Sequence, residues 1–400
     1  MTAKIAYFVH DLSDPAVHRR VRMLVHGGAT VTPIGFRRSV DAPTAVEGTR
    51  AVDLGRTRDA MLARRALSVF ETLVKLDGIA DHVRDCDVVL ARNLEMLVLA
   101  VRARKLYAPK ATVVYECLDI HRLQLSNGLS GKMLRFLESS LWGEIDLLLT
   151  SSPAFVDNYF SQQGFTAPIR LVENKVLTLG AEDTRIPSVS TPPGPPWRIG
   201  WFGMLRCRKS LEILSSIAQA AEGAVEVVIR GRPSDAVFPD LEIATAKLAH
   251  VRYGGPYNNP DDLSGIYGDV HFIWAIDYHD HGQNSAWLLP CRMYEGSFYG
   301  AVPIAFAGVE TGRWLAKRGA GVLFGEPLES QLFESQLTEF FRGLDRDRFR
   351  ALAHGVEALP RKDLAIDRSD CRELVEALCR SSADHPRSFL ATTTVERTHR

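Results

Sequence analysis

The sequence predicts an α/β protein of two domains, each built on a parallel sheet. Three observations lead to this prediction. Short apolar runs alternate with longer amphipathic runs, a segment rich in Pro, Ser and Thr interrupts the alternation at 183–197, and the alternation then starts again. Alternating strands and helices are typical of parallel sheets with crossover helices. The length of 400 residues fits two domains of ordinary size.

The first half of the chain contains four apolar runs that we expect to be buried strands, with helical patterns between them. In the first helical pattern, Val17, Val21 and Leu24 fall on one face of a helix. Pro15 suits its first turn and Gly27 suits its end. The expected strands are 4–9, 87–91, 111–116 and 146–151, and the expected helices are 15–28, 94–107 and 130–142.

The segment 183–197, DTRIPSVSTPPGPPW, has little to bury and predicts an interdomain linker. After it we expect strands at 198–203, 225–231, 270–275, 302–306 and 321–324, and helices at 210–223 and 285–300. The expected division is a first domain over 1–182, the linker over 183–197 and a second domain over 198–365. A C-terminal helix and tail over 366–400 would complete the chain, with the option of returning to the first domain.

The composition narrows the class of protein. A hydrophobic content of 46% with 24% charged residues is that of a globular protein, and a net charge of zero gives no global reason to expect nucleic acid. The six cysteines are scattered without a C-x-x-C pair, which favours reduced thiols over disulfides or zinc. The start is too short and too soon acidic for a signal peptide, and there is no apolar run of about 18 residues. We therefore expect a cytoplasmic location.

The second domain opens with WFGMLRCRKSLEIL, a pattern that suits an anion. We expect the strand to end near Phe202, Gly203 to turn the chain and a helix to begin near Ser210. Amide groups at a helix N-terminus attract anions, and Arg206, Arg208 and Lys209 add positive charge beside them. A phosphate or pyrophosphate fits such a place. The alternative is a basic helix start on the surface.

The stretch YEGSFYGAVPIAF, 294–306, carries a single charge, that of Glu295. We expect Glu295 late in a helix that begins near Asn284, with Arg292 on the same face. Gly300 and Pro303 end this helix and lead into the next strand. A carboxylate there could accept two hydroxyl hydrogens from a ribose at the edge of a cleft between the domains. The alternative is a surface ion pair with Arg292.

Candidate catalytic groups follow two strands of the first domain. Asp119 and His121 come just after the strand 111–116, where a carboxylate could take the proton of an acceptor hydroxyl as a general base. His10, Asp11 and Asp14 follow the first strand in the same way. Asp119 is the first choice for the base, because Asp14 could be only a helix cap and His121 only structural.

The cluster DYHDHGQN, 277–284, suggests a metal site at first sight. We expect none, because the cluster lies on a loop and no ligand from another strand is recognisable. Contact with a donor sugar is the favoured interpretation. Asn284 and Ser285 would then also cap the following helix.

Taken together, these segments resemble the nucleotide-sugar glycosyltransferases of the GT-B fold, in their family 4-like branch. The segment RMYEGSFYGAVPIAFAGVETGRWLAKRGAGVLF is most similar to bacterial exopolysaccharide glycosyltransferases of the rhizobial succinoglycan kind, and the resemblance runs from about residue 4 to 325. It implies two Rossmann-like domains that face each other across a cleft, the first binding the acceptor and the second the nucleotide sugar. It also implies transfer of a hexose, with UDP-glucose the expected donor, to a growing oligosaccharide on a polyprenyl diphosphate, without a metal or other cofactor.

The resemblance also assigns roles to single residues. Glu295 matches the acid that binds the donor ribose, and Lys209 matches the lysine that binds its pyrophosphate. The family's usual Arg falls on Met204, so Arg206 is its expected substitute, and a second acid near the transferred sugar is replaced by Trp287. That replacement favours an inverting displacement. The expected donor-binding residues are Gly203, Arg206, Lys209, Asn284, Arg292 and Glu295, and the expected catalytic residues are Asp119, Asp14 and His121.

Two other functions stay open. A nucleotide-sugar epimerase of the same fold would need only the donor, and a non-catalytic module would bind nucleotide or polysaccharide in support of a partner. For the transferase, two stretches with basic residues beside apolar ones, 56–75 and 131–142, predict peripheral contact with an anionic membrane. The alternative is that their apolar residues belong to the domain core. In the second stretch the residues concerned are Lys132, Met133, Arg135, Phe136 and Trp142.

Overall fold

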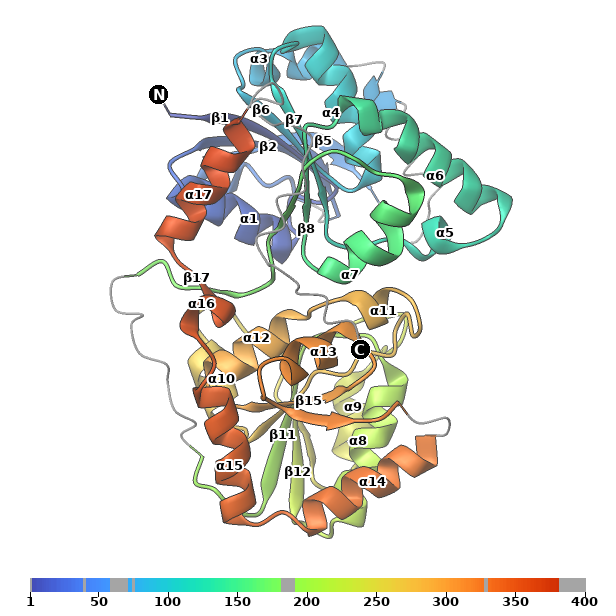
Figure 1. The fold of residues 1–400 in the computed structure, drawn as a ribbon, viewed down its shortest axis with the longest axis vertical. Coiled ribbons are helices and arrows are strands. Elements are labelled where there is room, and N and C mark those ends of the chain that lie inside the picture. Colours follow the sequence, from blue (N-terminus) through green and yellow to red (C-terminus); the bar gives the residue numbers. More distant parts are fainter. Residues whose placement is uncertain are drawn as a thin grey trace, which may run out of the picture. The chain divides into compact units, whose positions relative to one another are not determined.

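A computed structural model describes residues 2–38, 41–57, 71–73, 76–180, 191–326 and 330–380 of the chain (Figure 1). The chain divides into two compact units, unit 1 with residues 1–173 and 367–400 and unit 2 with residues 174–366. The boundary therefore lies after Glu173 and not after residue 182, because β10 (Val176–Leu177) pairs in parallel with β17 (Ala365–Ile366) inside unit 2. Of the expected linker, residues 183–190 lie outside the described residues.

Unit 1 is built on a seven-stranded parallel sheet in the order β5-β2-β1-β6-β7-β8-β9. The four strands expected in this half are confirmed as β1, β6, β7 and β8. Strand β2 was not expected, because Pro33 and Gly35 interrupt its apolar run. The strands are β1 (Lys4–Val9), β2 (Thr30–Arg37), β5 (Val52–Arg56), β6 (Val88–Arg92), β7 (Thr112–Cys117), β8 (Leu147–Thr150) and β9 (Ile169–Leu171), with a small antiparallel pair β3 (Ala45–Val46) and β4 (Thr49–Arg50).

The three helices expected in this half are confirmed as α1 (Pro15–His26), α4 (Leu94–Tyr107) and α6 (Leu129–Leu141). The chain returns to unit 1 at its C-terminal end, where α17 (Arg368–Cys379) packs beside α1 (Figure 1). The approach is close enough that a Cβ on Gly27 would lie 2.4 Å from the carbonyl oxygen of Cys371. Shorter helices are α3 (Ala80–Val83), α5 (Arg122–Leu125) and α7 (Pro153–Phe155), with single turns η1 (Leu76–Ile79), η2 (Trp142–Glu144), η3 (Val156–Phe160) and η4 (Ser161–Gln163).

Unit 2 repeats this plan with a six-stranded parallel sheet in the order β13-β12-β11-β14-β15-β16. All five strands expected here are confirmed. The three-residue strand β13 was not expected. The strands are β11 (Trp197–Leu205), β12 (Val225–Pro233), β13 (Val251–Tyr253), β14 (Phe272–Trp274), β15 (Val302–Phe306) and β16 (Val322–Phe324).

One expected helix of unit 2 is broken in two. We expected a continuous helix over 285–300, but α11 (Asn284–Trp287) ends before Pro290 and α12 (Cys291–Phe298) begins after it. A proline interrupts a helix because it lacks the N–H and clashes with the preceding turn. The other helices are α8 (Arg208–Ala220), α9 (Leu241–Ala246), α10 (Leu263–Gly268), α13 (Glu310–Ala316), α14 (Ser330–Arg342), α15 (Arg346–Glu357) and α16 (Arg361–Leu364).

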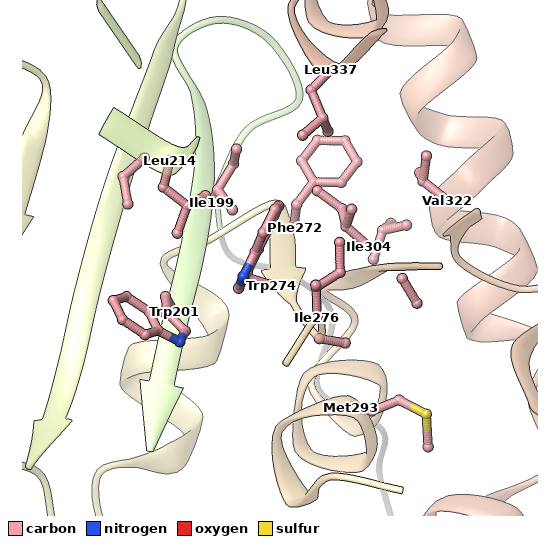
Figure 2. Packing of buried hydrophobic residues seen from close by; sticks show 14 of the residues in the cluster. Ile199, Trp201, Leu214, Phe272, Trp274, Ile276, Met293, Ile304, Val322 and Leu337 are labelled. Carbon is pink, nitrogen blue, oxygen red and sulfur yellow. The ribbon is translucent and has the colours of Figure 1, made fainter. Parts of the chain in front are cut away.

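The core of unit 2 packs large rings of adjacent strands against the helices. Figure 2 shows Trp201 of β11 with Phe272 and Trp274 of β14, and around them Leu214 of α8 and Leu337 of α14. These five side chains are at most 2% exposed. Because cores of this density tolerate little movement, the loops that leave β11 and β14 start from fixed positions.

Candidate functional site

In each unit the strand order reverses at one place, and there the loops of two neighbouring strands diverge. In unit 2 this switch point lies between β11 and β14, and in unit 1 between β1 and β6. Ligands of open parallel sheets bind at the carboxyl ends of the strands beside such a point. Apart from Gly203, which lies within β11, the residues expected to bind the donor follow β11 and β14, and the loop 10–14 follows β1.

Helix α8 is held at its N-terminus by buried hydrogen bonds. The indole Nε1 of Trp274 donates to the hydroxyl of Ser210 over 3.1 Å, and the thiol of Cys207 accepts from the backbone N of Ser210 over 3.3 Å. The helix begins at Arg208 and not at Ser210. Gly203 does not turn the chain either: it lies within β11, in register with Gly231, and its φ of +110° suits glycine.

The two expected phosphate-binding residues lie against residues that follow β14. The guanidinium of Arg206 is 3.9 Å from the carboxylate of Asp277, and the ammonium of Lys209 lies 4.5 Å from the ring centre of Tyr278. The structure thus brings the loop after β11 and the loop after β14 together at the switch point. Lys209 is exposed and Arg206 is half-exposed, so both cations can be reached from solution.

Glu295 is a buried carboxylate, 7% exposed, in the middle of α12 and not near its end. Its Oε2 accepts from the hydroxyl of Tyr267 over 2.6 Å, and its Oε1 accepts from the side-chain amide of Asn259 over 3.0 Å. Burial and the nearby charge of Glu295 raise the pKa of the Tyr267 phenol, so this hydroxyl remains a donor. A carboxylate has about four acceptor positions and no hydrogen of its own, so it binds only donors.

Arg292 ties the start of α12 to the same edge of the sheet. Its Nη2 donates to the backbone carbonyl of Ile276 over 3.1 Å, two residues beyond the end of β14. Its Nε is buried and has no hydrogen-bond partner among the residues that the structure describes. The alternative interpretation, a surface ion pair between Glu295 and Arg292, requires an exposed carboxylate. It is wrong, because the carboxylate of Glu295 is buried.

Residues 277–283 of the cluster form a loop that leads into α11, and their side chains contact different neighbours. The Nε2 of His281 lies 2.6 Å from Glu326, and Ser285 accepts from the backbone N of Asp280 over 2.9 Å. Asn284 is buried as the first residue of α11, so neither it nor Ser285 is the expected helix cap. No group of three metal-ligating side chains occurs within the described ranges.

In unit 1 the expected catalytic residues lie in two separate places. Asp119 is exposed on the loop after β7. The Nδ1 of His121 accepts from the backbone N of Leu123 over 3.2 Å, so this histidine caps α5. Asp14 caps α1 through Ala16 and also lies 3.3 Å from the Nε2 of His10. The two sets are separated by β6, which lies between β1 and β7.

A buried charge network, which the sequence analysis missed, lies beneath the loop 10–14. Glu116 is fully buried and receives Arg20 Nε at 2.5 Å, the Tyr7 hydroxyl at 2.5 Å and Arg92 Nη1 at 3.3 Å. Burial alone would raise the pKa of Glu116, but the two guanidinium groups and the hydrogen bond from Tyr7 lower it. The four residues come from α1, β1, β6 and β7, and no local spacing in the sequence indicates that they meet.

One relative of known pathway matches nearly the whole chain. The chain is 44% identical over 390 residues to the succinoglycan biosynthesis protein ExoL of Rhizobium meliloti (strain 1021). The aligned residues cover 96% of this chain and 95% of ExoL. No protein-family model matches the chain.

Solved structures match the fold at low sequence identity. Sucrose-phosphate synthase from Thermosynechococcus elongatus has a TM-score of 0.66 at 12% identity, covering 94% of this chain and 96% of its own. HepE of Anabaena, solved with UDP and glucose, has a TM-score of 0.63 at 14% identity, covering 94% and 98%. These likenesses show the fold, and the predicted class, GT-B with two Rossmann-like α/β domains, is confirmed.

Proposed function

This chain belongs to the family of the succinoglycan biosynthesis protein ExoL and has the GT-B fold of glycosyltransferases. On that premise we propose that it is a glycosyltransferase of exopolysaccharide biosynthesis. It would move a hexose, with glucose from UDP-glucose the first candidate, to a growing oligosaccharide carried on a polyprenyl diphosphate. The observation that carries the proposal is the buried carboxylate of Glu295 beside the switch point of unit 2.

Unit 2 is the proposed donor-binding unit. Glu295, whose carboxylate accepts from Tyr267 and Asn259, would also accept hydrogen bonds from the two ribose hydroxyls. Arg206 and Lys209, next to the N-terminus of α8, would bind the diphosphate and offset its charge as it leaves. These side chains and helix α8 could stabilise the leaving group by themselves, so the proposed mechanism uses no metal.

The proposed chemistry is an inverting displacement. By the resemblance to family 4-like enzymes, Trp287, the last residue of α11, replaces a second acid, so the site would have no carboxylate there beside the transferred sugar. A single base in unit 1 would then deprotonate the acceptor while the donor is attacked from the opposite face. Analysis of the anomeric configuration of the product by NMR tests this: a β-linked product from an α-linked donor is expected, and an α-linked product contradicts it.

Transfer itself is tested by incubating the pure protein with a panel of labelled nucleotide sugars and a bacterial lipid extract. Label is expected to move from UDP-glucose into the lipid fraction, and only when the extract is present. Conversion of the donor to an isomeric nucleotide sugar without extract would show the epimerase. Binding without any turnover of the donor would show a non-catalytic module.

The phosphate assignment predicts a difference between two ligands. Arg206→Ala and Lys209→Ala should each weaken the binding of UDP by about fivefold to tenfold and leave that of uridine unchanged, because partly exposed charge pairs are modest in strength. Calorimetry with both ligands measures this. Arg208→Ala, which removes an exposed neighbour that donates to the carbonyl of Val237, is the matched control. Equal losses for UDP and uridine would mean that the two residues only support the fold.

A peripheral membrane location is the second part of the proposal. Helix α6 carries an exposed apolar face, here called the α6 face. Arg122 and Lys132 are exposed close to it in the sequence, while the only acid of α6, Glu138, is buried and accepts from Tyr115 and Tyr159. Basic residues beside an apolar helix face suit an anionic bilayer. The α6 face consists of Leu129, Met133, Phe136 and Leu137, which are 81%, 71%, 76% and 41% exposed.

Two residues that were expected to contact the membrane instead make contacts within the protein. Trp142 packs edge-to-face on Phe165 at 5.3 Å, and Arg135 donates to the backbone carbonyls of Gln124 and Ser126. Of the other stretch, 56–75, residues 58–70 and 74–75 lie outside the described residues. No helix in the described part of the chain has the length and apolar character to span a bilayer.

Vesicle sedimentation tests the α6 face. The protein should bind vesicles that contain phosphatidylglycerol at low salt, and high salt should release it. The double variant Met133→Ser and Phe136→Ser should bind several-fold more weakly. Ile243→Ser with Leu332→Ser, which alters two exposed apolar residues of unit 2, is the control. Equal binding by both double variants would contradict the assignment.

A further inference from the structure

We propose that His10, oriented by Asp14, is the general base that takes the proton of the acceptor hydroxyl. The inference rests on the glycosyl transfer proposed above. It replaces Asp119 as the base and makes Asp14 a positioning residue.

His10 lies at the place where an acceptor is expected to bind in unit 1. His10 directly follows β1, whose carboxyl end borders the switch point of unit 1. Arg92, the last residue of β6, borders the same point from the other strand. Asp119 follows β7 and is therefore one strand farther away. Because ligands of open parallel sheets bind beside the switch point, an acceptor in unit 1 would meet His10 first.

Asp14 orients the imidazole of His10. Asp14 is fixed at the start of α1, because its Oδ1 accepts from the backbone N of Ala16 over 2.8 Å. Its Oδ2 lies 3.3 Å from the Nε2 of His10. A carboxylate can only accept, so a neutral His10 must carry its proton on Nε2, and its lone pair is then on Nδ1.

The Nδ1 of His10 is the nitrogen that would take the proton. The atom is buried and has no hydrogen-bond partner in the part of the chain that the structure describes, while the side chain of His10 as a whole is 12% exposed. Buried polar atoms are usually paired, so an acceptor nitrogen left open beside a switch point is available to a hydroxyl hydrogen. A hydroxyl hydrogen of an acceptor would complete it.

Asp14 has the charge that this role requires. Burial would raise its pKa, but the hydrogen bond with His10 and the positive charge of Arg92 outweigh burial and lower the pKa below its ordinary range. The partner of His10 is therefore a carboxylate, which stabilises the imidazolium formed during the reaction. His121 has no comparable arrangement, because its Nδ1 already accepts from Leu123.

The Nδ1 of His10 takes the proton of the acceptor hydroxyl, and the oxygen lone pair forms a bond to the anomeric carbon of the donor. The bond from that carbon to the diphosphate oxygen breaks, and its electron pair leaves with the nucleoside diphosphate. The imidazolium then releases its proton to water.

Turnover of His10→Gln tests the assignment. The Gln amide can still donate to Asp14 but is no base, so kcat should fall by about 10²–10⁴-fold, the usual range for general base catalysis, with unchanged affinity for UDP-glucose. Asp119→Asn, the matched control, should keep kcat within about twofold. Added imidazole should restore part of the activity of His10→Ala. A kcat near that of the wild type in His10→Gln, or a large loss in Asp119→Asn, overturns the assignment.

The tautomer is measured separately from activity. In spectra of protein labelled with [15N]histidine, the signal that disappears in His10→Gln should show a proton on Nε2 and none on Nδ1. A proton on Nδ1 overturns the inference. A wild-type protein that transfers no sugar contradicts the proposed function, whereas an active wild type with an active His10→Gln contradicts only this inference.

Discussion

Glu116→Gln should lower the free energy of unfolding of unit 1 by about 3–5 kcal/mol, because it leaves the guanidinium groups of Arg20 and Arg92 buried without a counter-charge. Both guanidinium groups are about 5% exposed, and Glu116 is fully buried. Hydrogen exchange of the amides in β1, β6 and β7 reports on this unit alone. Glu47→Gln is the matched control, because Glu47 also pairs with an arginine, Arg22 at 2.9 Å, but is 22% exposed.

The control should cost less than about 1 kcal/mol, because solvent screens a partly exposed pair. Equal effects of the two substitutions would contradict the importance of burial.

The network also predicts a pH dependence. The pKa of Glu116 is lowered in the folded protein, so its contribution is fully present above the unfolded value of about 4.3 and is lost as pH falls through the lower, folded pKa. The difference between wild type and Glu116→Gln should therefore shrink as the pH falls below about 4.3.

Glu295→Gln should weaken the binding of UDP-glucose by about 10–150-fold, which corresponds to the 1.5–3 kcal/mol of a hydrogen bond to a charged group. The carboxylate only accepts, and it already receives Tyr267 and Asn259. An amide in its place would direct an NH₂ group at a donor and would retain fewer acceptor positions for the ribose hydroxyls. Calorimetry with UDP-glucose, UDP and uridine measures the loss, which should be similar for all three because each contains the ribose.

Two controls separate binding from folding. Glu310→Gln, an acid in the first turn of α13 that pairs with Arg313, should leave nucleotide affinity unchanged. Tyr267→Phe removes one donor to Glu295 and keeps the carboxylate, so its affinity for UDP-glucose should stay within a few-fold of the wild type. A folded Glu295→Gln protein, judged by circular dichroism and melting temperature, that binds UDP-glucose as tightly as the wild type would contradict the ribose assignment.

Local pattern by itself determined the fold class and most of its elements. Alternating apolar and amphipathic runs predicted nine of the strands, because a buried parallel strand is a short continuous apolar run whose neighbours need not be known. The placing of Arg206 and Lys209 after β11 follows from the same reasoning, since the carboxyl end of a strand is visible in the sequence. Element ends were less accurate, as the break at Pro290 and the continuation of β11 through Gly203 show.

Contacts between distant segments were decided only by the tertiary structure. Asn259 and Tyr267 lie 36 and 28 residues from Glu295, and Tyr7 lies 109 residues from Glu116. No periodicity links such positions, because the order of strands in the sheet brings them together. His10 was visible beside Asp14, but the sequence could not tell that the Nδ1 of its ring is buried and open. That depends on how the loop after β1 packs at the switch point, which is a property of the assembled sheet and not of the loop alone.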